Sequence, residues 1–281
     1  MKNLIDKIYD LICRASCEIP EDIQSALKKA YKKEADVSPA RQQLELILKN
    51  IRIAEDRNQP LCQDTGALTF FVSCPRNFDK AAFRKSAESA IIKATNDGLL
   101  RKNSVCPITG MNDGTNIGPG SPMIYWDEKA SKKLEVKLLL KGGGSENVGV
   151  QYSLPDDKLG AGRDIDGIRR CVLDAVYKAQ GKGCPPSITS VCVGGDRASG
   201  YAEAKKQFLR KIGERSKDPS IAKLERRLLS EINSLGIGAM GLGGKTTALD
   251  VFISVLNRVP ASYFVTVSQM CWACRRRKAS L

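Results

Sequence analysis

The stretch "LCQDTGALTFF", residues 61–71, places polar side chains directly before an apolar run. Cys62, Gln63 and Asp64 precede Leu68–Val72, whose aromatic and β-branched residues predict a short strand. An unpaired carboxylate is costly to bury, so Asp64 is out of place beside a purely structural cysteine. We therefore interpret this stretch as the floor of a functional site at the entrance to a strand.

Length and composition indicate an ordinary globular protein. The chain has 281 residues, of which 42% are hydrophobic and 27% charged, enough to bury a substantial core. No apolar stretch approaches the ~18 residues that a membrane span needs. Residues 4–12 place leucine and isoleucine on one helical face, with Asp6 and Asp10 within the pattern, which predicts a docking helix and not a signal peptide. We expect a cytoplasmic protein with no membrane partner.

Histidine is absent from the chain, whereas cysteine occurs ten times. The absence of histidine excludes Ser-His-Asp and Cys-His catalysis, and it leaves thiolates or carboxylates as the ligands for any metal. In a reducing compartment these cysteines are not expected to form a disulfide framework. We interpret Cys171, on an expected helix, and Cys192, in an apolar run, as small buried hydrophobic residues.

The chain is strongly basic, with 45 basic and 31 acidic residues and a formal net charge of +14. Basic residues concentrate in residues 28–33, 205–227 and 275–278. One interpretation is an electrostatic footprint for a polyanion, and the other is a set of solvated helix faces. No nucleic-acid motif accompanies the charge, and aromatic residues are only 6% of the chain, which leaves few stacking platforms. We predict no nucleic-acid partner; an acidic small substrate or an acidic partner subunit fits the charge equally well.

The hydrophobic patterns predict a mixed α/β (α+β) fold, with sheets flanked by helices in a single large domain, residues 1–281. Helices are expected within the first 60 residues, one of them starting at the Ser38-Pro39 signal, and over residues 78–100, 164–180, 202–213, 222–236 and from Thr246 onward. Strands are expected at residues 68–72, 134–140, 188–193 and 263–268, and residues 105–126 are expected to be a loop.

Two glycine-rich segments, residues 142–144 and 243–247, offer backbone N–H groups to a ligand. Glycine permits close approach of the main chain, a helix N-terminus favours an anion, and Lys245 adds a positive charge. A carboxylate-bearing ligand is one interpretation, and glycines that only serve tight turns are the other. The nearby "GIGAMG", residues 236–241, matches a dinucleotide pattern but follows a helix and lacks the later acid, and Ala239 breaks the P-loop pattern.

Three cysteines, Cys62, Cys184 and Cys271, lie at chain reversals or strand ends, where a side chain can point into a cleft. Three separated thiolates without histidine would suit a [4Fe–4S] cluster with one open iron. The alternative is a zinc site that combines Cys271 and Cys274 with two cysteines of the first helix, although the latter spacing is poor. Spacing alone leaves both interpretations open.

Five motifs follow one another along the chain: "PLCQDTG" (60–66), "LLLKGGGSEN" (138–147), "GKGCPPSITSVCVGGDRA" (181–198), "MGLGGKTTALDV" (240–251) and "PASYFVTVSQMCWACRRR" (260–277). Together they resemble the alpha subunit of class I iron–sulfur fumarate hydratases and L-tartrate dehydratases. The resemblance implies a [4Fe–4S] cluster held by three cysteines, whose fourth iron acts as a Lewis acid. The positions that match are Cys62, Cys184 and Cys271 for the cluster, Asp64 for the acid/base group, and Gln63, Arg101 and Gly144 for substrate contacts, with Cys274 as a bystander.

The resemblance implies a hydro-lyase that reversibly dehydrates a 2-hydroxy dicarboxylate, malate to fumarate, with tartrate as the alternative substrate. It also implies an oxygen-sensitive alpha subunit that requires a separate beta subunit, in an α₂β₂ assembly. Two residues depart from the family pattern, since Val259 stands where histidine is usual and Cys106 where aspartate is common. These departures leave open a non-catalytic iron–sulfur sensor or scaffold.

Overall fold

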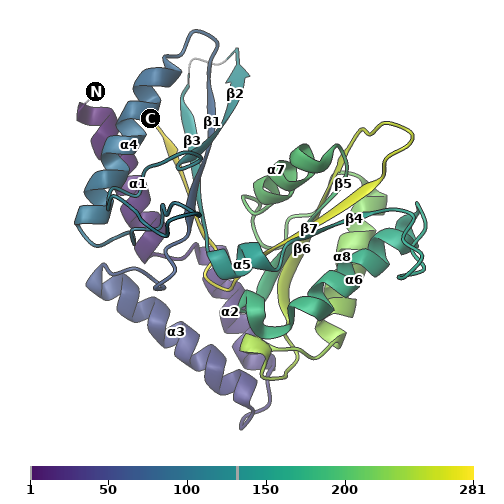
Figure 1. Cartoon of the computed structure of the whole chain (residues 1–281). Helices are drawn as coiled ribbons and strands as arrows, with labels where there is room; N and C mark the ends of the chain where they lie inside the picture. Colours follow the sequence, from purple (N-terminus) through teal and green to yellow (C-terminus); the bar gives the residue numbers. More distant parts are fainter. Residues whose placement is uncertain (1, 131–132) are drawn as a thin grey trace. The chain divides into compact units, whose positions relative to one another are not determined.

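The computed structural model describes residues 2–130 and 133–281 (Figure 1). It contains two four-stranded mixed sheets flanked by helices, which confirms the predicted mixed α/β class. The chain divides into two compact units. Unit 1 comprises Met1–Pro20, Lys49–Gly143 and Arg275–Leu281, and unit 2 comprises Glu21–Leu48 and Gly144–Cys274. None of the described helices is both long enough and apolar enough to cross a membrane.

Unit 1 is a sheet packed against two helices. Its elements are α1 (Lys2–Cys17), β1 (Ala67–Pro75), α4 (Lys80–Asn96), β2 (Met123–Lys129), β3 (Glu135–Lys141) and β8 (Arg275–Ser280). The strand order is β2-β1-β3-β8, with β1 and β2 parallel and the other neighbours antiparallel. The apolar side chains of α1 and α4 form one core with those of β1 and β3. Phe70 and Phe83 are fully buried there, and each contributes about 1.5–3 kcal/mol of hydrophobic stabilisation.

Two helices begin or end at the signals that their sequence carries. Asp79 caps the start of α4 by accepting a hydrogen bond from an N–H three residues later at 2.8 Å, and Gly98 follows its end with φ +76°. The hydroxyl of Ser38 likewise accepts an N–H at 3.2 Å where α3 (Pro39–Arg57) begins. The predicted helix over residues 78–100 and the predicted start after Ser38 are confirmed.

Unit 2 contains the second sheet, with strand order β4-β7-β5-β6. Its elements include α2 (Glu21–Lys33), β4 (Val150–Ser153), α6 (Ile165–Ala179), β5 (Ser187–Gly194), α7 (Arg197–Gln207), α8 (Pro219–Ser234), β6 (Ala248–Leu256) and β7 (Phe264–Met270), with short turns η1 (Gln180–Gly183) and η2 (Ala239–Gly241). Strand β5 is buried along its whole length because it lies between β6, which is parallel, and β7, which is antiparallel. Helices α3 and α5 (Gly143–Asn147) carry the chain from one unit to the other.

The helix expected from Thr246 is wrong, because residues 248–256 form β6. Val251, Phe252 and Ile253 are buried, and such aromatic and β-branched residues favour a strand that is covered on both faces. The helix expected over residues 202–213 is α7, which begins earlier because Asp196 caps it through the N–H groups of the next turn.

Besides β6, three strands of the described residues were not expected, namely β2, β4 and β8. The loop expected over residues 105–126 gives way to β2 at Met123, where pairing with β1 begins. The basic residues 275–278 lie in β8, where Arg275 and Arg276 are buried, so the interpretation of this segment as a solvated helix face is wrong. All three strands depend on partners distant in sequence, which a local pattern does not reveal.

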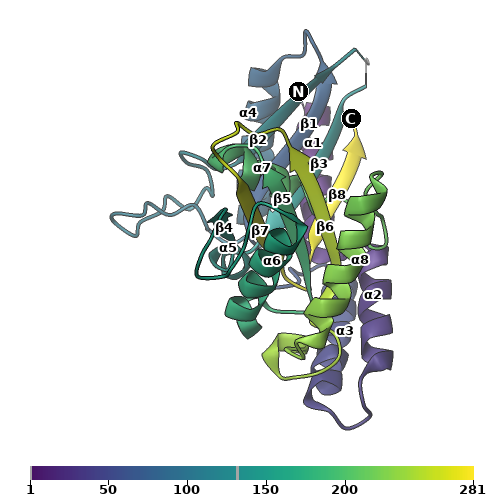
Figure 2. The ribbon, with the colours of Figure 1, turned by 90° about the vertical axis from the view of Figure 1, so that its right-hand side faces the viewer.

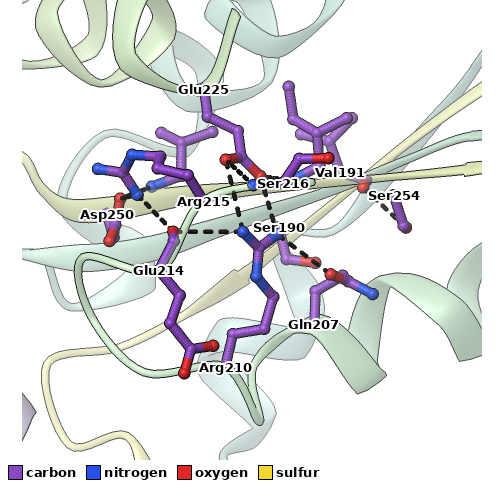
Figure 3. Close-up of polar contacts among 12 residues, drawn as sticks. Ser190, Val191, Gln207, Arg210, Glu214, Arg215, Ser216, Glu225, Asp250 and Ser254 are labelled. Atoms are coloured by element: carbon purple, nitrogen blue, oxygen red, sulfur yellow. Dashed lines mark hydrogen bonds and ion pairs between the residues drawn. The ribbon is translucent and has the colours of Figure 1, made fainter. Parts of the chain in front are cut away.

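Unit 2 also buries two ion pairs (Figure 3). Glu225 of α8 is fully buried and accepts a hydrogen bond from Nη1 of Arg210 at 2.8 Å. Asp250 of β6 is 1% exposed and accepts one from Nη1 of Arg215, also at 2.8 Å. Both arginines come from the segment between α7 and α8, so the two pairs hold this segment within unit 2.

Candidate functional site

A cavity of about 600 Å³ lies within unit 1 and contains part of the predicted site. Cys62, Gln63 and Arg101, which are widely spaced in sequence, line it together. Its remaining lining residues are Asn58, Gln59, Pro60, Thr65, Asp97, Gly98 and Leu99. The cavity thus forms where the segment before β1 meets the end of α4, and it brings a thiol, an amide and a guanidinium to one surface.

The turn at residues 62–66 is held against the end of β3. Gly66 has φ +84°, and a Cβ there would come within 2.8–2.9 Å of the main chain of Lys141, so only glycine fits. Oδ1 of Asp64 accepts a hydrogen bond from the N–H of Gly66 at 3.1 Å, while Oδ2 lies beside Gly142. Asp64 is half-buried, as expected for a carboxylate at the floor of a site.

Arg101 begins the long loop between α4 and β2, which extends away from the strands of unit 1 (Figure 2). Its backbone N–H donates to Oγ1 of Thr65 at 3.0 Å. Its side chain is exposed, and no carboxylate within residues 2–130 and 133–281 forms an ion pair with its guanidinium. The guanidinium is therefore available to a ligand carboxylate, which such a planar group binds well.

Two of the three predicted cluster ligands meet at one end of the sheet in unit 2. Strands β5 and β7 are antiparallel, with Ile188 opposite Met270, so the start of β5 lies beside the end of β7. Cys184 precedes β5 and Cys271 follows β7, and the N–H of Trp272 donates to the carbonyl of Cys184 at 3.1 Å. Both cysteines are half-buried, as is Cys62 in unit 1.

Beneath these cysteines, the sheet buries polar atoms that have no hydrogen-bond partner among the described residues. Nε2 of Gln269 and Oγ1 of Thr189 are such atoms, and the two residues are direct cross-strand neighbours. A Cβ on Gly183 would lie 3.2 Å from Oε1 of Gln269, which places this amide beside the residue that precedes Cys184. Buried polar groups are almost always paired, so this Nε2 is a candidate donor to a bound group.

The glycine loop near Lys245 does not have the role that its sequence suggests. The carboxylate of Glu34, which is 5% exposed, accepts hydrogen bonds from the N–H groups of Lys245 at 2.8 and 3.0 Å and of Thr246 at 3.0 Å. The expectation that these two N–H groups are open to a ligand is wrong, since Glu34 occupies them. The side chain of Lys245 is exposed, and its contact with a substrate remains a prediction.

The predicted residues are distributed over both units. Cys62, Gln63, Asp64 and Arg101 belong to unit 1, and those in unit 2 are Gly144, Cys184, Lys245 and Cys271. Over the described ranges, no three His, Cys, Asp or Glu side chains are grouped so that they could hold a metal ion. The three-cysteine ligand set therefore remains a prediction.

The remaining cysteines differ widely in environment. Burial raises the pKa of the Cys171 thiol to about 12 and that of Cys192 to about 11, which confirms their interpretation as buried hydrophobic residues. Cys274 is also fully buried. Cys106 is exposed, and hydrogen bonds from Thr109 lower the pKa of its thiol.

The sequence interpretation missed three residues around the site, namely Thr65, Gln269 and Glu34. Thr65 and Gln269 lie within two or three residues of Cys62 and Cys271, and that proximity was a usable signal. Glu34 had none, because more than 200 residues separate it from the loop that it binds.

Comparisons with known proteins cover nearly the whole chain. A family model described as "Fumarate hydratase (Fumerase)" matches residues 5–280. A "Putative fumarate hydratase class I" from Geobacillus stearothermophilus is 42% identical over 279 residues, which are 98% of this chain but 54% of that relative. A "Putative L(+)-tartrate dehydratase subunit alpha" from Methanocaldococcus jannaschii is 42% identical over 277 residues, 96% of this chain and 95% of the relative. The "L(+)-tartrate dehydratase subunit alpha" of Escherichia coli O157:H7 is 30% identical over 283 residues, 98% of this chain and 90% of the relative. The chain thus spans about half the length of the first relative and nearly all of the other two.

Proposed function

Because the chain belongs to the fumarate hydratase family, we propose that it is the alpha subunit of a hydro-lyase that reversibly dehydrates malate to fumarate. The observation that carries the proposal is the cavity in unit 1, in which Gln63 and the unpaired guanidinium of Arg101 line one surface with Cys62. Dehydration of tartrate is the second candidate, favoured by the names of the two relatives that match along almost their whole length.

We infer that Cys62, Cys184 and Cys271 hold a [4Fe–4S] cluster. The residues present fit such a group: all three thiols are half-buried, and the unpaired Nε2 of Gln269 lies close to the segment that carries Cys184. Amide N–H groups commonly donate to the sulfur atoms of iron–sulfur sites. When bound, the cluster supplies a Lewis acid toward the hydroxyl group of the substrate.

The residues of unit 1 have distinct roles in this reaction. The guanidinium of Arg101 binds one carboxylate of the substrate through paired N–H donors. The amide of Gln63 orients the substrate beside it. Asp64 donates a proton to the leaving hydroxyl in dehydration and takes it back from water in hydration. Two residues of unit 2 supply further contacts to the dicarboxylate, namely Gly144 through its main chain and Lys245 through its ammonium group.

We further propose that the enzyme is cytoplasmic and that residues 1–281 function as one domain made of both units. A separate beta subunit, in an α₂β₂ assembly, supplies the base that removes the C–H proton of the substrate. The relatives named as alpha subunits support such a partner. A non-catalytic iron–sulfur protein is the alternative, motivated by Val259, an exposed residue where histidine is usual in the family.

The test is anaerobic reconstitution with iron and sulfide, followed by visible absorption, EPR and hydratase assays with the beta subunit. Cys62→Ser, Cys184→Ser and Cys271→Ser should each abolish the cluster signal. Cys106→Ser, at an exposed position, and Cys274→Ser serve as controls and should retain it. Turnover of malate or of tartrate then identifies the substrate. A cluster without turnover of either would favour the sensor, and no cluster in the wild type would overturn the proposal.

A further inference from the structure

The hydroxyl of Thr65 joins the two segments that line the cavity of unit 1. Thr65 is 1% exposed, and its Oγ1 accepts hydrogen bonds from the N–H of Arg101 and from Nδ2 of Asn103, both at 3.0 Å. The residue itself follows Gln63 and Asp64 in the turn before β1. One buried oxygen therefore fixes the turn that carries the acid/base residue to the segment that carries the arginine.

Asn103 strengthens this connection from the loop side. Its Nδ2 also approaches the carbonyl of Gly66 at 3.4 Å, and its own N–H donates to the carbonyl of Arg101 at 2.8 Å. The N–H of Arg101 is thus bound by Thr65, and its carbonyl is bound by Asn103.

Asn116 closes the network at the base of the long loop. Its Oδ1 accepts hydrogen bonds from the N–H groups of Asn103 and Ser104, both at 3.1 Å. The residue is 1% exposed and has φ +64°, a conformation that asparagine tolerates better than most residues. Asn116, farther along the loop, is therefore bound back to the segment that contains Arg101 and Asn103.

We propose that Thr65 is a positioning residue that sets the reach of Arg101 toward the substrate carboxylate. The proposal rests on the function proposed above, in which Arg101 binds that carboxylate. An arginine side chain is long and flexible, so the placement of its main chain decides which part of the cavity its guanidinium can reach. Loss of the hydroxyl leaves the N–H of Arg101 without its acceptor at a half-buried contact, and it leaves Nδ2 of Asn103 with only the longer contact to Gly66, so the segment must shift to pair the N–H of Arg101.

The test compares Thr65→Val, which keeps the shape but removes the hydroxyl, with Thr65→Ser, which keeps the hydroxyl. Both are assayed in the cluster-loaded enzyme with its beta subunit. For Thr65→Val we expect KM to rise about tenfold or more while kcat changes less than about threefold, since binding of the carboxylate is what weakens. Thr65→Ser should restore KM to within about threefold of the wild type.

The matched control is Thr95→Val, because within the described residues the buried hydroxyl of Thr95 donates only to the carbonyl of Ile91 in its own helix. It should leave KM unchanged. Asn103→Ala, at an exposed position, removes one of the two donors and should raise KM by a smaller factor, which keeps the inference testable if Thr65→Val does not fold. Combined with Arg101→Ala, Thr65→Val should add little further loss, because both act on one contact.

Two outcomes would overturn the inference: an unchanged KM in Thr65→Val, or equal losses in Thr65→Val and Thr95→Val. A wild-type enzyme that carries its cluster but turns over neither malate nor tartrate would instead overturn the proposed function. In that case calorimetric titration of the same variants with malate tests the inference without turnover. Equal affinity for malate in the wild type and Thr65→Val, or no binding by either, would count against the inference.

Discussion

Asp64 and Gly142 lie so close together that a side chain on the glycine would meet the carboxylate, since a Cβ on Gly142 would lie 2.7 Å from Oδ2 of Asp64. Gly142 does not have a positive φ, so alanine would be acceptable to the backbone itself. An alanine at residue 142 would therefore meet the side chain of Asp64 and not the main chain, so the Asp64 carboxylate would have to move aside.

Gly142→Ala should therefore displace Asp64 and lower kcat, by about tenfold to a hundredfold, because a shift of about 1 Å in a catalytic group has effects of this size. Gly143→Ala is the matched control, since a Cβ there would lie 3.8 Å from the same oxygen, an ordinary contact. Steady-state kinetics of the two variants at equal cluster content checks this. Equal losses of kcat would show that the glycine segment matters for some other reason.

Thiol reactivity should follow the environments of the cysteines. Cys106 is exposed, and its pKa is lowered by Thr109, so it carries more thiolate at neutral pH than an ordinary cysteine. Cys171 and Cys192 are buried with pKa values raised to about 12 and about 11, so their thiols stay protonated. We expect iodoacetamide to modify Cys106 first and these two last, with the rate at Cys106 levelling off at a lower pH than for a free thiol. Mass spectrometry of the cluster-free protein over time measures this, and labelling of Cys171 as fast as Cys106 would contradict it.

Sequence alone predicted the helices whose ends are marked by local capping residues. The caps at Ser38 and Asp97-Gly98 are local, and they correctly fixed the start of α3 and the end of α4. Strand β8 could not be found in this way, because its basic residues acquire a strand conformation only by pairing with β3, for example Arg277 with Leu138. The helix expected from Thr246 failed for a related reason, since burial between other elements decides the conformation of that apolar run.

In the candidate site, too, features set by neighbouring residues were predicted from the sequence, whereas contacts between distant segments were not. The position of Cys62 before a strand, and of Cys271 after one, was visible in the sequence. That Gln63 and Arg101 share one cavity was expected only from resemblance, because it depends on how the end of α4 meets the turn before β1. The capture of the glycine loop by Glu34 was not foreseeable, as no pattern marks a residue that pairs across most of the chain.

The buried ion pairs of unit 2 should contribute strongly to its stability. Glu225 is fully buried and also accepts the N–H groups of Ser216 at 3.0 Å and Ile253 at 2.9 Å, so Glu225→Gln leaves the charge of Arg210 without its partner. We expect the free energy of unfolding to fall by about 3 kcal/mol, as for other broken buried pairs.

The control for this change is Asp166→Asn, which removes an exposed carboxylate that pairs with Arg170 and Arg169. The side chain of Asp166 is 52% exposed and that of Arg170 is 48% exposed. The cost of Asp166→Asn should be much smaller than that of Glu225→Gln, since water screens such pairs. Urea unfolding of both variants gives the comparison, and similar losses in the two would refute the assignment of a structural role to Glu225.

Nε2 of Gln269, which has no hydrogen-bond partner within the described residues, leads to a prediction that is tested by the properties of the cluster and not by activity. If Cys184 and Cys271 hold the proposed cluster and Nε2 donates toward it, Gln269→Leu removes that donor. The reduction potential of the reconstituted cluster should then fall, because donors to the sulfur atoms stabilise the more reduced and more negative state. Thr189→Val is the control, as it removes the other unpaired polar atom on the same face of the sheet. An EPR-monitored redox titration should show a shift only for Gln269→Leu, together with faster loss of visible absorption in air. Equal potentials in both variants and the wild type would mean that the amide of Gln269 does not reach the cluster.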